Sequence, residues 1–241
     1  MTTDNGPRRP WVVGVTGASG TPYAAAVLRG LLDAGEDVDL VLSQAARLTL
    51  LDETGHTVRD KHWQADVGAW IGRDVSRVRY WTAGDMAAGP ASGSYRTKGM
   101  VVVPATTASV AGIATGTNKN LLQRAADVTL KERRRLILVL RETPLRLSTL
   151  DNLRALAVEG AIIMPASPGF YAGANDIDQL VDFLAGRVLD LCDVEHDLYQ
   201  RWAGTLGAAR SRQPDPGRDD DGGGEFDLAD SDTAYLAPRA R

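Results

Sequence analysis

The sequence predicts one α/β domain of three layers, Rossmann-like or flavodoxin-like, built on a mainly parallel sheet. Apolar runs of strand length alternate with helix-length segments, which is typical of βαβ units whose sheet is covered on both faces. The first run leads straight into a glycine-rich turn, and Thr21-Pro22 then opens a helix. The expected strands are residues 12–15, 38–42, 78–81, 100–103, 136–140 and 161–164.

Composition sets the expected domain boundaries. Residues 1–10 are polar and are predicted to be a flexible N-terminus, because they lack the apolar core of a secretory signal. Residues 11–204 form the predicted domain, and the chain's 44% hydrophobic content is enough for a real core. Residues 205–241 are rich in Asp, Gly and Pro, which predicts a disordered acidic, Gly-rich tail.

Charge and residue types argue against several classes of protein. The net charge is −4 and the basic residues are dispersed, so neither a nucleic-acid surface nor a membrane patch is expected. No stretch approaches the roughly 18 unbroken apolar residues of a membrane span. Cys192 is the single cysteine, and the three His residues occur without a CxxC, so we expect no disulfide framework and no metal site. A cytoplasmic protein is predicted.

The glycine-rich turn after the first strand is a candidate anion site. Gly14, Gly17 and Gly20 allow a tight turn, whose backbone N–H groups and following helix start could face a phosphate. Their spacing matches neither the dinucleotide fingerprint nor a P-loop. The turn alone is therefore a weak indication of a nucleotide site.

Hydroxyl side chains follow two further strands. Ser43 ends the second strand where dinucleotide folds carry an acid, and Thr106, Thr107 and Ser109 follow the strand at 100–103. These residues are also common helix N-caps, which is the structural alternative. Because the carboxyl ends of parallel strands share one edge, the three strand ends together favour a phosphorylated mononucleotide cofactor.

The segment from Asn120 to Pro144 gathers cations and a carboxylate. In a helix at 121–133, Arg124 and Lys131 lie about two turns apart on nearly the same face, which could hold a phosphate. Arg141 and Glu142 follow the strand at 136–140, where open α/β sheets bind ligands. The alternative is a solvated helix face with weak ion pairs.

An ordered series of motifs between Val12 and Trp202 resembles the UbiX-type flavin prenyltransferases. The motifs are Gly17-Ala18-Ser19-Gly20, Ser43-Gln-Ala-Ala46, Ala91-Ser92-Gly93-Ser94, Arg124-Ala-Ala-Asp127-Val, Leu130-Lys131-Glu132-Arg133-Arg134, Arg141-Glu142-Thr143-Pro144 and Pro168-Gly169-Phe170-Tyr171. The resemblance implies transfer of a dimethylallyl group from dimethylallyl monophosphate to N5 and C6 of reduced FMN. It further implies a homo-oligomer, a dodecamer, which supplies prenylated FMN to a UbiD-type decarboxylase.

The resemblance also assigns site residues. FMN binding falls to Gly17, Ala18, Ser19, Ser43, Thr106, Thr107, Ala108, Ser109 and Arg141. The prenyl phosphate falls to Arg124, Lys131, Tyr171 and Arg187, with Trp202 beside Tyr171 as an aromatic wall, in a pocket that neighbouring subunits complete. Proton transfer falls to Glu142, with Ser19 and Glu53 as a relay.

Two differences from the family pattern and two other functions stay open. The hydroxyl cluster is Pro-Ala-Thr-Thr-Ala-Ser, where relatives often have Cys-Ser after the proline. The loop 85–88 lacks the Trp that some members have there, so the sequence does not determine which prenyl chain is transferred. One alternative is an FMN-dependent cysteine decarboxylase of the phosphopantothenoylcysteine or lantibiotic type, for which His56 is the candidate histidine. The other is a non-catalytic, flavin-binding subunit associated with a decarboxylase.

Overall fold

The computed structural model describes residues 9–170 and 174–202, all within one unit, Met1–Ala203. The predicted tail and nearly all of the predicted flexible N-terminus lie outside the described residues. The strands are β1 (Trp11–Val15), β2 (Val38–Leu42), β3 (Val78–Thr82), β4 (Gly99–Ala105), β5 (Arg135–Leu140) and β6 (Ile162–Pro165). The α-helices are α1 (Thr21–Asp33), α2 (Gln44–Thr54), α3 (Trp63–Ile71), α4 (Thr107–Ala114), α5 (Leu121–Lys131), α6 (Leu147–Val158) and α7 (Ile177–Leu191). Two 3₁₀ turns, η1 (Asp60–His62) and η2 (Gly89–Ala91), complete the described elements.

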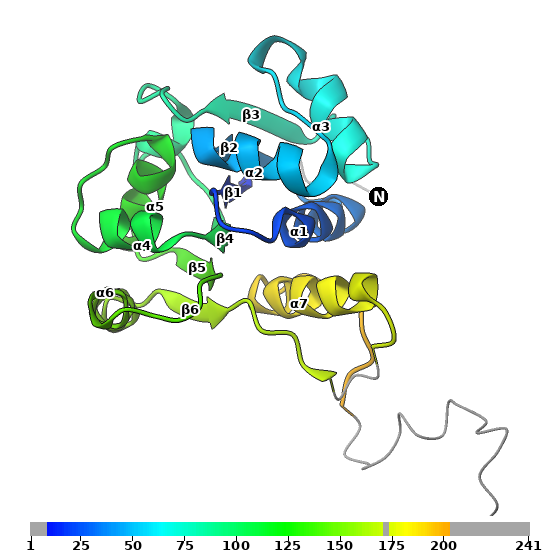
Figure 1. Cartoon of the computed structure of the whole chain (residues 1–241). Helices are drawn as coiled ribbons and strands as arrows, with labels where there is room; N and C mark the ends of the chain where they lie inside the picture. Colours follow the sequence, from blue (N-terminus) through cyan, green and yellow to red (C-terminus); the bar gives the residue numbers. More distant parts are fainter. Residues whose placement is uncertain (1–8, 171–173, 203–241) are drawn as a thin grey trace, which may run out of the picture. The chain divides into compact units, whose positions relative to one another are not determined.

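The six strands form one parallel sheet in the order β3-β2-β1-β4-β5-β6, which Figure 1 shows from top to bottom. This confirms the predicted α/β class, and the order is that of the Rossmann fold rather than of flavodoxin. The chain builds outward from β1 to β3 and then returns to the other side of β1 with β4. The sheet therefore has its crossover point between β1 and β4, where α/β proteins bind ligands.

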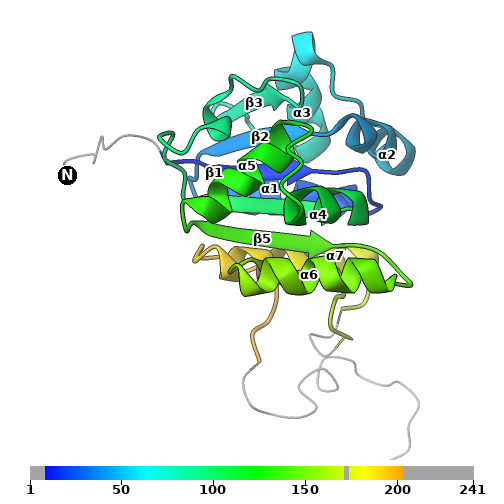
Figure 2. The ribbon, with the colours of Figure 1, turned by 90° about the vertical axis from the view of Figure 1, so that its left-hand side faces the viewer.

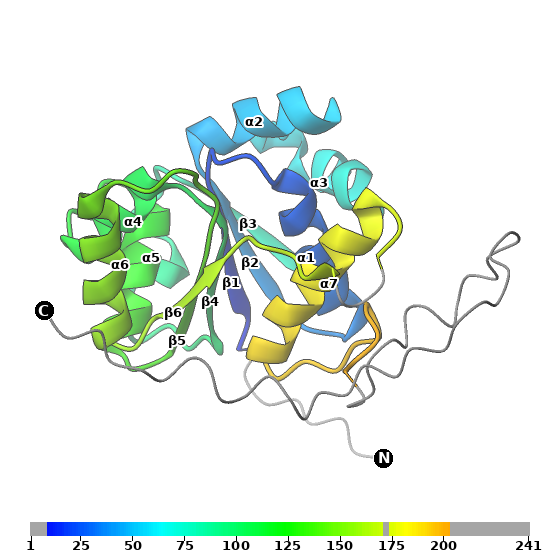
Figure 3. The ribbon, with the colours of Figure 1, turned by 60° about the horizontal axis from the view of Figure 1, so that its bottom comes forward.

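Helices cover both faces of the sheet, as predicted. In β1, Val13 and Val15 pack into the core under α1, α2, α3 and α7, whereas Val12 packs into the core under α4, α5 and α6. This alternation is the two-residue period of a strand. Figure 2 shows the layer of α4, α5 and α6 toward the viewer, and Figure 3 shows both layers on opposite sides of the strands. None of the described helices is long and apolar enough to cross a membrane.

Helix α5 ends at Lys131, two residues before the predicted end at Arg133. Arg133 adopts the left-handed conformation with φ 55°, and Arg134 donates its N–H to the carbonyl of Thr129 at 2.9 Å. This arrangement satisfies the last carbonyls of a helix and stops it. The physical reason lies in backbone geometry that the run of cations does not reveal.

Candidate active site at the crossover point

Thr16 joins the two strand ends at the crossover point. Its hydroxyl donates to the carbonyl of Pro104 at 2.7 Å and accepts the N–H of Thr106 at 2.9 Å, and the residue is buried. The glycine turn after β1 and the hydroxyl cluster after β4 are thereby held side by side. Thr16 was not expected from the sequence, although a hydroxyl residue directly after a buried strand is a usable signal.

The glycine turn is shaped by close contacts. Gly20 has φ 116°, a conformation that side chains rarely adopt, and a Cβ there would lie 2.7 Å from the ring of Tyr23. A Cβ on Gly17 would lie 2.5 Å from that of Ala45, at the start of α2. Both glycines are therefore required for packing, beside any role in binding a phosphate.

Glu53 occupies the start of helix α1. Its carboxylate accepts the N–H of Gly20 at 2.9 Å, and both the N–H and the hydroxyl of Thr21, at 2.8 and 2.6 Å. Burial raises the pKa of Glu53, but hydrogen bonds, including one from Ser19, outweigh it and hold the pKa below its usual value. A carboxylate held in this way suits the positioning of Ser19 and α1 better than proton donation. A phosphate at this turn would need other donors than these two N–H groups.

The hydroxyls of Ser43 and Thr106 act as helix N-caps, as the structural alternative expected. Ser43 accepts the N–H of Ala46 at 3.1 Å at the start of α2. Thr106 accepts the N–H of Ser109 at 3.1 Å at the start of α4, and its hydroxyl donates to that of Ser109 at 2.9 Å. In the first turn of α4, Thr107 is half-buried and Ala108 is exposed.

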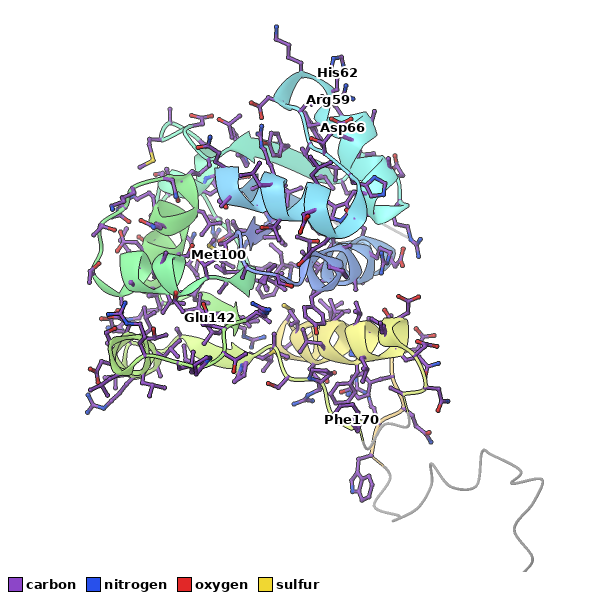
Figure 4. The ribbon with its side chains drawn as sticks, in the orientation of Figure 1. Arg59, His62, Asp66, Met100, Glu142 and Phe170 are labelled. Atoms are coloured by element: carbon purple, nitrogen blue, oxygen red, sulfur yellow. The ribbon has the colours of Figure 1, made fainter. Side chains whose placement is uncertain are left out.

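Arg141 and Glu142 lie where the sequence predicted them, past the carboxyl end of β5. The N–H of Arg141 donates to Ala105 at the end of β4, at 3.2 Å, which places the pair next to the crossover point. Glu142 is exposed, and its carboxylate accepts the N–H of Thr143 at 3.1 Å. Figure 4 labels Glu142 at the end of β5.

Tyr23 lies beside the glycine turn and was not expected there from the sequence. Burial raises the pKa of its phenol, while the charge of Arg141 lowers it and that of Glu53 raises it. The Tyr23 ring lies beside Gly20 in the turn after β1, and its phenol is within electrostatic reach of Arg141 in the loop after β5. A Tyr in the first turn of a helix that follows a glycine turn carries no distinctive signal in one sequence.

Arg124 and Lys131 both lie on α5 and both face the loop that contains Ala91 and Gly93. Arg124 donates from Nε to the carbonyl of Ala91 at 3.1 Å and from Nη1 to Asp127 at 2.7 Å. Lys131 pairs with Glu132, and a Cβ on Gly93 would lie 2.7 Å from the Lys131 ammonium. The predicted shared face is present, and this glycine leaves room for it.

Arg187 lies at the opposite edge of the sheet from Glu142. Arg135, the first residue of β5, donates to the carbonyl of Leu191 and to Asp193, so the end of α7 is fixed beside the amino end of β5. Arg187 is one turn before that end, whereas Glu142 follows the carboxyl end of the same strand. One chain therefore does not bring these two predicted site residues together. Trp202 is 57% exposed, and Tyr171 lies outside the described residues.

The histidine of the alternative hypothesis lies in a turn. His56 follows Gly55, which ends α2 in the left-handed conformation with φ 72°.

Within residues 9–170 and 174–202, no group of three or more His, Cys, Asp or Glu side chains could hold a metal ion.

Sheet order, the crossover point and the polar strand ends define an α/β protein with a candidate ligand site at the carboxyl ends of its strands. The sequence pattern of the flavoprotein family matches residues 1–189. The chain belongs to that family and, within it, to the UbiX-type flavin prenyltransferases. The flavin prenyltransferase UbiX of Streptomyces coelicolor is 63% identical over 83% of this chain and 98% of its own length. That of Pseudomonas aeruginosa is 38% identical over 82% and 95%.

Solved structures agree with this assignment. AnUbiX, in complex with FMN and dimethylallyl pyrophosphate, has a TM-score of 0.74 and 39% identity, over 83% of this chain and all of its own. A dodecameric FMN-dependent UbiX-like decarboxylase from Escherichia coli O157:H7 has a TM-score of 0.72 and 37% identity, over 81% and 100%. A phosphopantothenoylcysteine (PPC) decarboxylase mutant, at 13% identity and a TM-score of 0.51, shares the fold alone.

Proposed function

We propose that this protein transfers the dimethylallyl group of dimethylallyl monophosphate to N5 and C6 of reduced FMN. The observation that carries the proposal is the position of Arg141 and Glu142 at the crossover point, within a chain 63% identical to a flavin prenyltransferase. FMN fits this edge, because Gly17 to Ser19, Ser43 and Thr106 to Ser109 bring three strand ends and two capped helix starts together.

The chain's residues divide the chemistry between them. Reduced FMN, when bound, supplies the nucleophilic atoms. Glu142, exposed beside Arg141, moves a proton at the flavin, and Glu53 orients Ser19. Arg124, Lys131 and Arg187 stabilise the charge that develops on the phosphate as the allylic C–O bond breaks. Tyr171 and Trp202 shield the prenyl group from water.

The complete site is shared between copies of the chain. Arg187 and Glu142 lie at opposite edges of one sheet, so a site that contains both takes Arg187 from a neighbouring subunit. Exposed apolar side chains support an assembly: Leu147 and Val158 of α6 are 74% and 78% exposed. A homo-oligomer follows, and the dodecameric E. coli relative suggests its size.

The product, prenylated FMN, passes to a UbiD-type decarboxylase in the cytoplasm. The single Cys192, buried at the end of α7, agrees with a reducing compartment. No observation favours the cysteine decarboxylases: the PPC decarboxylase is only 13% identical, and the candidate His56 lies in a turn.

Mass spectrometry tests the proposal. The protein is incubated without oxygen with reduced FMN and dimethylallyl monophosphate. The molecular mass of the extracted flavin is then measured. We expect the mass of FMN plus one dimethylallyl group, and a strongly reduced yield with Glu142→Gln. A flavin of unchanged mass from protein that binds FMN would overturn the proposal and favour the non-catalytic alternative.

A further inference from the structure

Asp190, near the end of α7, binds more side chains than a surface ion pair needs. Its carboxylate accepts from Arg187 at 3.0 Å, from His196 at 3.0 Å, from Arg201 at 2.7 Å and from the hydroxyl of Tyr199. Arg187 is on α7 and the other three donors are on the segment that follows it. The Asp190 side chain is only 16% exposed.

The segment after α7 is fixed on the helix by packing as well as by charge. The Nδ1 atom of His196 accepts the N–H of Leu198 at 3.2 Å, so the proton of the ring is on Nε2, which donates to Asp190. The ring of Tyr199 packs on that of Phe183 with centroids 4.9 Å apart. Gly186 provides the space, because a Cβ there would lie 2.5 Å from Tyr199.

This arrangement orients Arg187 and leaves some of its N–H donors available. Among the described residues, its hydrogen bonds to Asp190 and Tyr199 both come from Nη1. A guanidinium has five N–H donors, so within residues 9–170 and 174–202 those on Nε and Nη2 are available for an oxyanion. The side chain is 47% exposed. Two guanidinium groups, of Arg187 and Arg201, share one carboxylate, which leaves a net positive charge for a phosphate.

We propose that Asp190 is a positioning residue of the prenyl-phosphate site: it fixes Arg187, and the segment that leads to Trp202, before substrate binds. The inference rests on the proposed function. A free Arg side chain has about 2 kcal/mol of rotamer entropy to lose on binding. Restraint by Asp190 removes part of that cost beforehand. Burial raises the pKa of Asp190, but hydrogen bonds from Tyr199, Arg201 and His196 lower it to about 2, so the carboxylate stays charged at working pH.

The test compares Asp190→Asn with Tyr199→Phe, which keeps the ring and removes only the hydroxyl. We expect the KM for dimethylallyl monophosphate to rise about tenfold in Asp190→Asn and about threefold in Tyr199→Phe, with FMN affinity and oligomeric state unchanged. Asp193→Asn is the matched control, because Asp193 follows the same helix end but pairs with Arg135. Its KM should stay within twofold of the unsubstituted protein.

A double-mutant cycle with Arg187→Ala separates positioning from general damage to the fold. If Asp190 acts through Arg187, adding Asp190→Asn to Arg187→Ala changes KM little further. The proposal would be overturned if the KM increases of the two single variants multiplied in the double variant. It would also be overturned if Arg187→Ala raised KM and Asp190→Asn did not. A normal KM in Arg187→Ala would instead reject the role of Arg187 in binding the phosphate. The positioning role of Asp190 would be rejected with it. Should Asp190→Asn fail to fold, Tyr199→Phe in the same cycle decides.

Discussion

The carboxylate of Glu53, in the last turn of α2, binds the N–H and the hydroxyl of Thr21, the first residue of α1, at 2.8 and 2.6 Å. The end of one helix thus caps the start of the helix before it. The negative charge of Glu53 lies against the positive end of the α1 dipole. The glycine turn between β1 and α1 is held in place by this contact.

Replacement of Glu53 by Gln should lower the free energy of unfolding by about 1–2 kcal/mol, because an amide nitrogen takes the place of one acceptor oxygen. Urea denaturation measures the change. Asp52→Asn, an exposed neighbour, is the control and should be neutral. Coinciding denaturation curves for Glu53→Gln and the parent protein would show that the contact does not stabilise the fold.

Glu142→Gln should keep FMN bound and slow formation of prenylated flavin by ~10²–10⁴-fold, the effect of losing a positioned acid or base. Gln is nearly isosteric with Glu and cannot ionise. Single-turnover kinetics with reduced FMN measure the rate. If that rate is unchanged, Glu142 is not the group that transfers the proton.

Lys131→Ala should weaken the use of dimethylallyl monophosphate and spare FMN affinity, because Lys131 lies on α5 and not at the crossover point. The substrate dependence of the initial rate measures this, and a dependence equal to that of the parent would reject the phosphate role. Mixing Arg187→Ala with Glu142→Gln subunits should restore some activity, because the proposed site takes these two residues from different subunits. Absence of recovery after verified subunit exchange would argue against a shared site.

Asp190 should make stability depend on pH in the acid range. Its pKa in the folded protein is about 2, below the ~3.9 of an unfolded chain, so its contribution is complete above about pH 4. It is lost as the pH falls from about 4 to 2, and it amounts to roughly 2 kcal/mol. The stability difference between the parent and Asp190→Asn should shrink from pH 7 to pH 3. A constant difference would contradict the assignment.

A chain that ends at residue 204 should fold and bind FMN as the full-length protein does. The acidic, Gly-rich composition of 205–241 offers little apolar surface to bury. Thermal unfolding and flavin titration compare the two chains, and Trp202 is kept in both. Aggregation of the shorter chain, or loss of its flavin, would assign the tail a structural role.

The sequence predicted the elements well because their signals are local. Every expected strand is present, and Ser43 and Thr106 cap helices as their positions suggested. What it could not show were contacts between distant segments. The contact of Glu53 with Thr21 spans 32 residues, and the phenol of Tyr23 lies near Arg141 only because β1 and β5 flank β4.

The positions of site residues within one subunit were equally beyond the sequence. The family resemblance predicts that Arg187 and Glu142 act in one reaction, but motif order does not tell which end of the sheet each residue occupies. That depends on the direction of α7 against the strands, which the contacts of Arg135 with the helix end establish.

The placement of Arg187 and Glu142 at opposite edges has a consequence for the life of the protein in a cell. If both residues act in one reaction, a folded monomer is catalytically inactive. Activity then arises only when the chain assembles with other copies of itself. Dilution would then inhibit as a mutation does. Specific activity would rise with protein concentration until assembly is complete. Total activity in the cell would therefore increase more than linearly with the expression level.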